Sequence, residues 1–421
     1  MRRNYHILGL LFLVFFLISL LTNIIGPIIP DIIDSFGVSM TMAALLPFSF
    51  FIAYGVMSIP AGLLVEKFGE KLVMIAAFAV SMAGSLSFAL VPRYGVAVCS
   101  LFGIGIGMAM LQVAINPLLR TAGGEENFAF NEALAQLVFG SASFLSPRIY
   151  SYLVQNLERP APGKNLLLRT LATLTPTGLP WVSMYWIFAV STATMVLVLS
   201  FSRLPQAKRE LGDEAGSSQT YSKLFRKPVV WLFFAGIFAY VGSEQGVADW
   251  ISKFLEQYHG FDPHTTGAMA VSWFWGLMTA GCFLGLVLLK LFDSRKVLIC
   301  FSVGAILCLT AALFGPSQVS VIAFPAIGLF ASVMWPILVS LALNSVSEHH
   351  GSLAGILTTG IMGGAIVPLI IGRIGDYFGL RAGVSFLYLT LGYVLSVGFW
   401  AKPIVTNATI NLRKTEIPAS T

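Results

Sequence analysis

The stretch "YGVAVCSLFGIGIGMAMLQVAINPLL", residues 94–119, contains no charged side chain. It exceeds the roughly 20 apolar residues that cross a bilayer as a helix. Uncharged runs of the same kind cover residues 7–29 and 73–92. Only 10% of all residues are Asp, Glu, Lys or Arg, whereas soluble domains carry about a quarter. Because so few charges cannot cover a water-facing surface, the sequence predicts an all-α polytopic membrane protein.

The apolar segments number about twelve and are separated by polar turns or by turns with Gly and Pro. They cover residues 7–30, 41–65, 72–92, 94–119, 130–156, 180–203, 228–257, 265–291, 296–315, 318–346, 352–374 and 381–402. We expect an N-terminal six-helix bundle over residues 1–203, a cytoplasmic linker over 204–227, and a C-terminal six-helix bundle with a short cytoplasmic tail over 228–421. Two such halves are typical of transporters that bind substrate between repeats.

The loops on the two sides of these spans differ about two to one in their content of Lys and Arg. By the positive-inside bias, both termini and the linker should face the cytoplasm, as expected for a cytoplasmic (inner) membrane protein. The net charge of +6 follows from these loops and does not indicate a nucleic-acid partner. The four cysteines lie in apolar segments without metal-ligand spacing, so we expect no metal and no other cofactor.

Two amides, Gln112 and Asn116, lie about one helical turn apart inside the run that begins at Tyr94. Lipid offers no hydrogen-bond partner, so each amide needs one in the protein or on a ligand. They could hold a neighbouring helix, but polar groups inside a membrane tend to mark a substrate path. We therefore predict that both line a central site.

Two further spans contain polar groups of the same kind. Asn23 precedes Gly26 and two prolines, a segment that we expect to bend. In the fifth predicted span Glu132 and Gln136 share one helical face. All of these positions are candidates for the lining of the substrate path.

The seventh predicted span is rich in ionisable groups. Asp249 and Lys253 are four residues apart, which favours an ion pair within the helix. Gln245 lies on the same stripe as these two residues. Glu244 has no basic residue three or four positions away, so it needs a partner, a cation or a proton.

The loop after the second predicted span, "GLLVEKFGEK", resembles the loop signature of the major facilitator superfamily, G-x-x-x-(D/E)-(R/K)-x-G-x-(R/K). The matching residues are Gly62, Glu66, Lys67, Gly69 and Lys71. Gly69 permits a tight turn. Glu66 can hold a basic partner or a helix N-terminus in one conformational state. The resemblance implies a loop that takes part in conformational gating.

Four motifs resemble the fucose–galactose–glucose permease branch of this superfamily. They are "QVAINP" at 112–117, "ALAQ" at 133–136, "YVGSE" at 240–244 and "WGLMTAGCFLG" at 275–285. The resemblance implies a monosaccharide transporter that works by alternating access. Amides suit sugar hydroxyls because they donate and accept hydrogen bonds, and Trp275 could cover the apolar face of the sugar ring. The predicted substrate-binding residues are Asn23, Gln112, Asn116, Gln136, Glu244, Gln245 and Trp275.

Three positions depart from the pattern of this branch. Gln112 stands where the fucose symporter has the acidic residue that serves proton coupling, Gly26 aligns with the acidic residue of the first span, and Cys282 replaces the usual arginine. Gln112 cannot exchange a proton near neutral pH. Uniport, sodium coupling, or proton coupling moved to Glu244 or Glu132 therefore remain open, with proton symport the least favoured.

Asp249 is the third candidate for the coupling residue, beside Glu244 and Glu132. Apart from a coupling cation, which would be sodium or a proton, we expect transport to need no cofactor. Alternatives to sugar transport are export of amphipathic compounds, transport of another small metabolite, or a non-transporting membrane sensor. An enzyme is not expected, because the sequence has no nucleophile–base pair and no metal cluster. We expect a monomer whose partners are the lipid bilayer and a small substrate.

Overall fold

The computed structural model describes residues 5–123, 128–158, 165–204, 218–346 and 350–404. These ranges form helices joined by turns and contain no strand. Eleven of their segments are long and apolar enough to cross a membrane. α6 (Phe128–Glu158) is equally long but more polar, and it packs against α1 and α11, so we count it as a twelfth span. The predicted all-α membrane fold is confirmed.

The N-terminal half contains eight helices within the described ranges. They are α1 (Tyr5–Thr22), α2 (Ile25–Phe36), α3 (Met40–Phe68), α4 (Glu70–Leu90), α5 (Tyr94–Gly123), α6, α7 (Leu166–Leu174) and α8 (Ser183–Phe201). α1 and α2 form one span that is interrupted at Asn23 and Ile24, close to the predicted bend. α7 is a short helix between the fifth and sixth spans.

The C-terminal half repeats this plan with more interruptions. Its helices are α9 (Ser218–Phe225), α10 (Pro228–His259), α11 (Ala268–Leu291), α12 (Ser294–Phe314), α13 (Ser317–Ala331), α14 (Met334–Leu343), α15 (His350–Thr359), α16 (Gly363–Phe378), α17 (Leu380–Ser385) and α18 (Leu387–Trp400). A π-helical turn, η3 (Pro263–Gly267), precedes α11. Residues 205–217 of the predicted linker and 405–421 of the predicted tail lie outside the described ranges, so the domain boundaries stay a prediction.

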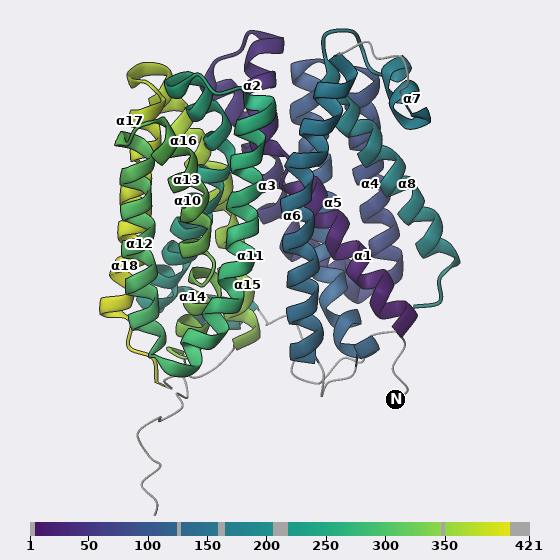
Figure 1. Cartoon of the computed structure of the whole chain (residues 1–421). Helices are drawn as coiled ribbons and strands as arrows, with labels where there is room; N and C mark the ends of the chain where they lie inside the picture. Colours follow the sequence, from purple (N-terminus) through teal and green to yellow (C-terminus); the bar gives the residue numbers. More distant parts are fainter. Residues whose placement is uncertain (1–4, 124–127, 159–164, 205–217, 347–349, 405–421) are drawn as a thin grey trace, which may run out of the picture.

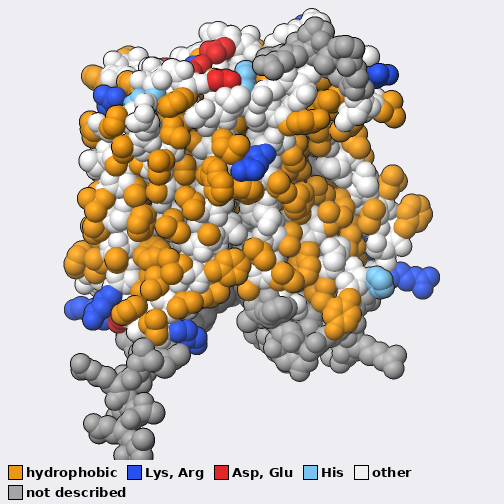
Figure 2. All heavy atoms as spheres, viewed as in Figure 1, with side chains coloured by type: hydrophobic (Ala, Val, Ile, Leu, Met, Phe, Trp, Pro, Cys, Tyr) orange, Lys and Arg blue, Asp and Glu red, His pale blue; other side chains and the backbone are white. Residues whose placement is uncertain are grey.

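The helices of the two halves stand side by side (Figure 1). α2 packs against α10, α3 against α16, and α6 against α11. Figure 2 shows hydrophobic side chains over the middle of the molecule, while most charged side chains lie near its two ends. This distribution is the one expected of a protein whose middle is surrounded by lipid.

The two halves approach most closely at glycines. A Cβ atom on Gly26 would lie 2.2 Å from the carbonyl oxygen of Ala248, and one on Gly140 would lie 2.0 Å from Oγ1 of Thr279. Neither position has room for a side chain. The close packing of α2 on α10 therefore explains why glycine occupies position 26, where the related branch carries an acidic residue.

We expect Gly26→Ala to lower the free energy of unfolding by roughly 1–3 kcal/mol, the usual cost of overpacking. Gly9→Ala is the matched control, because a Cβ at Gly9 meets no atom within 4 Å. Alanine there should be neutral or stabilising by up to about 1 kcal/mol. Thermal unfolding of the purified variants in detergent measures both effects, and equal melting temperatures would contradict the close contact between α2 and α10.

Polar contacts between the halves gather at the end of the molecule opposite the N-terminus, which we call the distal end (residues 31–41, 259–266 and 376–381). The carboxylate of Asp376 accepts hydrogen bonds from the backbone N–H groups of Met40 (2.8 Å) and Thr41 (2.9 Å), and also from the Thr41 hydroxyl. Asp376 of α16 thus caps the N-terminus of α3, where a negative charge is favoured.

A second distal contact joins α2 to the C-terminal half. Nε2 of His264 lies 2.8 Å from Oδ1 of Asp31, and the other oxygen of Asp31 accepts a hydrogen bond from the Tyr150 hydroxyl. Nζ of Lys253 lies 3.7 Å from Oδ1 of Asp34. These contacts, together with Asp376, hold the two halves against each other at this end.

Candidate functional site

The predicted amides of α5 and α6 are accessible. Asn116 and Gln136 are exposed and Gln112 is half-buried. Among the described residues, the Gln112 and Asn116 side chains have no hydrogen-bond partner, so neither amide serves there to hold a neighbouring helix. Nε2 of Gln136 donates to Oε1 of Glu132 at 3.1 Å. The other oxygen of Glu132 is buried without a partner in these ranges.

Asn23 lies in a contact between helices of the same half. Its Nδ2 donates to the hydroxyls of Ser143 (2.8 Å) and Ser19 (3.3 Å), and these two hydroxyls lie 2.7 Å apart. The amide nitrogen therefore joins α1 to α6. This structural role was not predicted, and it leaves a role in substrate binding as a prediction only.

Glu244 has neutral neighbours. Nε2 of Gln245 donates to Oε1 of Glu244 at 3.1 Å. Tyr240, one turn earlier on α10, and Cys282 of α11 both lie near the Glu244 carboxylate. Since cysteine stands where the related branch has arginine, the carboxylate lacks the basic neighbour that an arginine would provide.

The antiparallel packing of α6 against α11 brings Gln136 into the same region. Phe144 packs on Gly276, and Gly140 packs on Thr279. One helical turn further along both helices, the same pairing places Gln136 of α6 opposite the turn of α11 that contains Cys282. Gln136 and Glu244, which are far apart in the sequence, are thus brought toward one region between the halves.

Trp275 is buried on α11, and its ring lies edge-on to Phe274 with 5.1 Å between centroids. Its Nε1 has no hydrogen-bond partner among the described residues. A buried N–H group without a partner is costly, and an acceptor on a bound ligand would remove that cost. Trp250, in contrast, donates to the carbonyl oxygen of Pro368 at 3.3 Å and is a packing residue.

The predicted ion pair between Asp249 and Lys253 is wrong. Nζ of Lys253 lies 2.8 Å from Oε2 of Glu256, and it also faces Asp34. Asp249 is only 2% exposed, and its Oδ2 has no partner among the described residues. Lys253 reaches toward carboxylates at the distal end, whereas Asp249 is one turn deeper, where its backbone packs against Gly26.

Gln245, the neighbour of Glu244 on α10, is also largely enclosed. Its Cγ lies 3.0 Å from the position that a Cβ on Gly364 would take, and Phe51 of α3 borders the same spot. Gln245 therefore lies where α10, α16 and α3 meet. Only its amide, bonded to Glu244, is directed toward the polar cluster.

The signature loop lies at the end opposite the distal contacts. Gly69 has φ +78°, a conformation that favours glycine, and it joins α3 to α4 as a tight turn. Nζ of Lys71 donates to the carbonyl oxygens of Ser200 (3.0 Å) and Ser202 (2.8 Å) at the end of α8. Gly62 lies on α3, and Glu66 and Lys67 are exposed there. A gating role for this loop stays a prediction.

Sequence reasoning missed three features of this site. Tyr240 was recognised as part of the "YVGSE" motif but not as a neighbour of the Glu244 carboxylate. The position of Cys282 beside Glu244 was also not predicted. The Asp31–His264 contact was missed as well, because α2 and η3 are far apart in the chain. A tyrosine four residues before an isolated glutamate was the one available signal.

Known proteins resemble this chain over most of its length. The family model described as Major Facilitator Superfamily matches residues 11–368. A glucose/galactose transporter of Brucella abortus is 28% identical over 411 residues, which cover 94% of each chain. The L-fucose-proton symporter of Escherichia coli is 25% identical over 404 residues, 90% of this chain and 89% of that protein. A crystal structure of the E. coli fucose:proton symporter superposes with a TM-score of 0.64 at 21% identity, covering 94% of this chain and 98% of the other.

Proposed function

Because the chain belongs to the major facilitator superfamily, we propose that it carries a neutral monosaccharide, a hexose or deoxyhexose, across the cytoplasmic membrane as a monomer. Relatives named glucose/galactose transporter and L-fucose-proton symporter support a sugar as the substrate. The family and these relatives are transporters, so the chain is not an enzyme.

The observation that carries the proposal is the exposed Asn116 amide, which has no partner among the described residues although it lies in an apolar span. Such a group is available to bond sugar hydroxyls in either direction. Gln112 lies one turn away on the same helix, and Gln136 supplies a third amide from α6. Trp275 would add an aromatic face and an indole N–H donor, which has no hydrogen-bond partner in the described ranges.

We propose Glu244 as the group that a coupling cation neutralises. Its hydrogen-bond donor Gln245 is neutral, and Cys282 replaces the arginine that would otherwise balance its charge. Gln112 offers no proton site on α5, which favours sodium coupling or uniport over proton symport. Glu132 and Asp249 are the other candidates, since each has a buried oxygen without a partner in the described ranges.

Alternating access requires contacts that close one side while the other opens. The distal contacts could serve this purpose, because they join α2 and α3 to the C-terminal half. With both termini in the cytoplasm, the distal end would face outside, and the conformation described here would be closed to the outside. We propose that the loop over 62–71 helps to close the cytoplasmic side.

Uptake into proteoliposomes tests the proposal directly. Labelled fucose, galactose and glucose would be supplied with a sodium gradient, with a proton gradient and with neither. We expect saturable transport of at least one sugar. Transport of an amphipathic compound but of no sugar, by folded protein, would instead favour the export alternative.

Asn116→Ala should raise the half-saturation concentration for the sugar about 5- to 150-fold, since a lost hydrogen bond in a binding site costs roughly 1–3 kcal/mol. Asn156→Ala is the control, because that amide bonds only the carbonyl of Tyr152 on its own helix. Unchanged uptake in Asn116→Ala would remove Asn116 from the site.

A further inference from the structure

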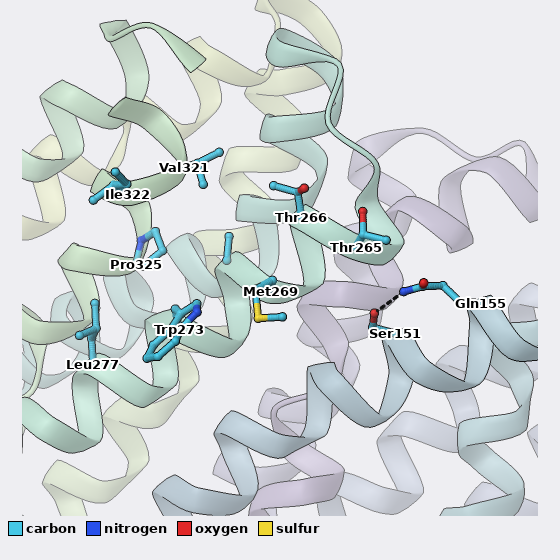
Figure 3. A pocket seen from close by; sticks show the side chains of 11 residues that line it. Ser151, Gln155, Thr265, Thr266, Met269, Trp273, Leu277, Val321, Ile322 and Pro325 are labelled. Atoms are coloured by element: carbon cyan, nitrogen blue, oxygen red, sulfur yellow. Dashed lines mark hydrogen bonds between the residues drawn. The ribbon is translucent and has the colours of Figure 1, made fainter. Parts of the chain in front are cut away.

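A lateral groove of about 540 Å³ runs between α6, α11 and α13 in the distal half of the molecule. Figure 3 shows polar side chains on one side of the groove, with Ser151 and Gln155 on α6 and Thr265 and Thr266 before α11, and apolar side chains on the other side. Leu277 and Pro325 belong to the apolar side. The groove thus has a polar side and an apolar side.

The groove faces away from the Glu244 cluster. Trp273, which lines it, is 47% exposed, whereas Trp275 is 5% exposed. Side chains two positions apart on a helix point about 200° away from each other. The rings of Trp273 and Trp275 therefore point to opposite sides of α11. Met269, one turn before Trp273, is also exposed in the groove. The groove is therefore open on the outer surface of the bundles, where lipid would lie.

An arginine, Arg148, is not among the residues that line this groove, but it contacts Trp273, which lines it. The Arg148 guanidinium carbon lies 4.1 Å from the ring centroid of Phe144 and 5.6 Å from that of Trp273. Its Nε donates to the Ser272 hydroxyl at 3.1 Å. Within the described part of the chain, Arg148 has no carboxylate partner, and neither of its Nη atoms has a hydrogen bond.

A positive charge inside a membrane span is costly unless a partner balances it, and within the described part of the chain no carboxylate does so for Arg148, so this position favours a bound anion. The planar guanidinium binds phosphate through two nitrogens at once. The charge of Arg148 and the apolar side of the groove together match an anionic amphipath. They do not match a sugar, which has neither a negative charge nor an acyl chain.

We propose that this groove binds an anionic phospholipid of the outer leaflet, with its phosphate at Arg148 and one acyl chain along Trp273, Leu277 and Pro325. The lipid would touch α6 of one half and α11 and α13 of the other. It would thereby stabilise the contact between the halves that Arg148 and Ser272 already make.

Thermal unfolding in mild detergent with added phosphatidylglycerol, compared with phosphatidylcholine of the same chains, tests the proposal. We expect phosphatidylglycerol to raise the melting temperature more. In Arg148→Gln the concentration of phosphatidylglycerol needed for half the shift should rise about fivefold or more. Arg373→Gln is the matched control. Like Arg148, Arg373 stacks on an aromatic ring, with its guanidinium carbon 4.7 Å from the centroid of Tyr377, but Tyr377, unlike Trp273, is not among the residues that line the groove.

Leu277→Trp provides a second test that leaves Arg148 unchanged. The larger ring should fill the apolar side of the groove and weaken the phosphatidylglycerol effect, even if Arg148→Gln fails to fold. An equal effect of both lipids on the wild type, or the same response in Leu277→Trp as in the wild type, would overturn the proposal. An equal shift with a fatty acid would overturn the phospholipid assignment.

Discussion

Glu244→Gln is expected to abolish uphill accumulation of the sugar while it leaves counterflow in place. Glutamine keeps the shape and the oxygen that accepts the hydrogen bond from Gln245, but it removes the charge that a sodium ion or a proton would neutralise. The accumulation ratio in proteoliposomes should therefore fall to about one under either gradient, as for any carrier without coupling. Counterflow measures whether the same protein still binds and moves the sugar.

Two matched variants make this result specific to Glu244. Glu132→Gln and Asp249→Asn each remove another carboxylate that has a buried oxygen without a partner among the described residues. Both should keep the accumulation ratio of the wild type. Accumulation that survives in Glu244→Gln but disappears in one of these variants would move the coupling site there. A wild type that never accumulates sugar under either gradient would leave uniport and exclude coupling at Glu244.

The fold could be predicted because its main constraint is local. Apolar runs longer than a bilayer crossing become helices whatever their neighbours are, and the interruption at Asn23 and the turn at Gly69 follow from local residue chemistry. The role of Gly26 could not be predicted in this way. Its need for space comes from the carbonyl of Ala248, on a helix far along the chain.

The site was predicted less completely, since helical spacing gives the face of a residue and not the neighbour that it meets. Asp249 and Lys253 have ideal spacing for an ion pair, yet Lys253 bonds Glu256 instead, because Asp249 is buried at the contact with α2. The absence of a basic residue near Glu244 in sequence was informative. The place of Cys282 beside it depends on how α11 packs, which no local pattern contains.

Asp376→Asn is expected to shift the protein toward conformations that are open at the distal end. The Asp376 carboxylate binds two backbone N–H groups at the first turn of α3 and links the two halves. A cap of this kind is worth roughly 0.5–2 kcal/mol, and asparagine keeps one acceptor but loses the charge that the helix N-terminus favours. A loss of about 1–2 kcal/mol would change the ratio of the two conformations roughly 5- to 30-fold.

Spin labels at residues 166 and 319, both exposed and one in each half, would report this shift as a longer distance in a cysteine-free background. Asp293→Asn is the matched control, because the Asp293 carboxylate also caps a helix N-terminus but bonds Arg295 of its own segment and does not link the two halves among the described residues. Its distance distribution should match that of the parent protein. If Asp376→Asn also leaves the distribution unchanged, the α16–α3 cap does not hold the halves together, and the Asp31–His264 contact becomes the structure that closes the distal end.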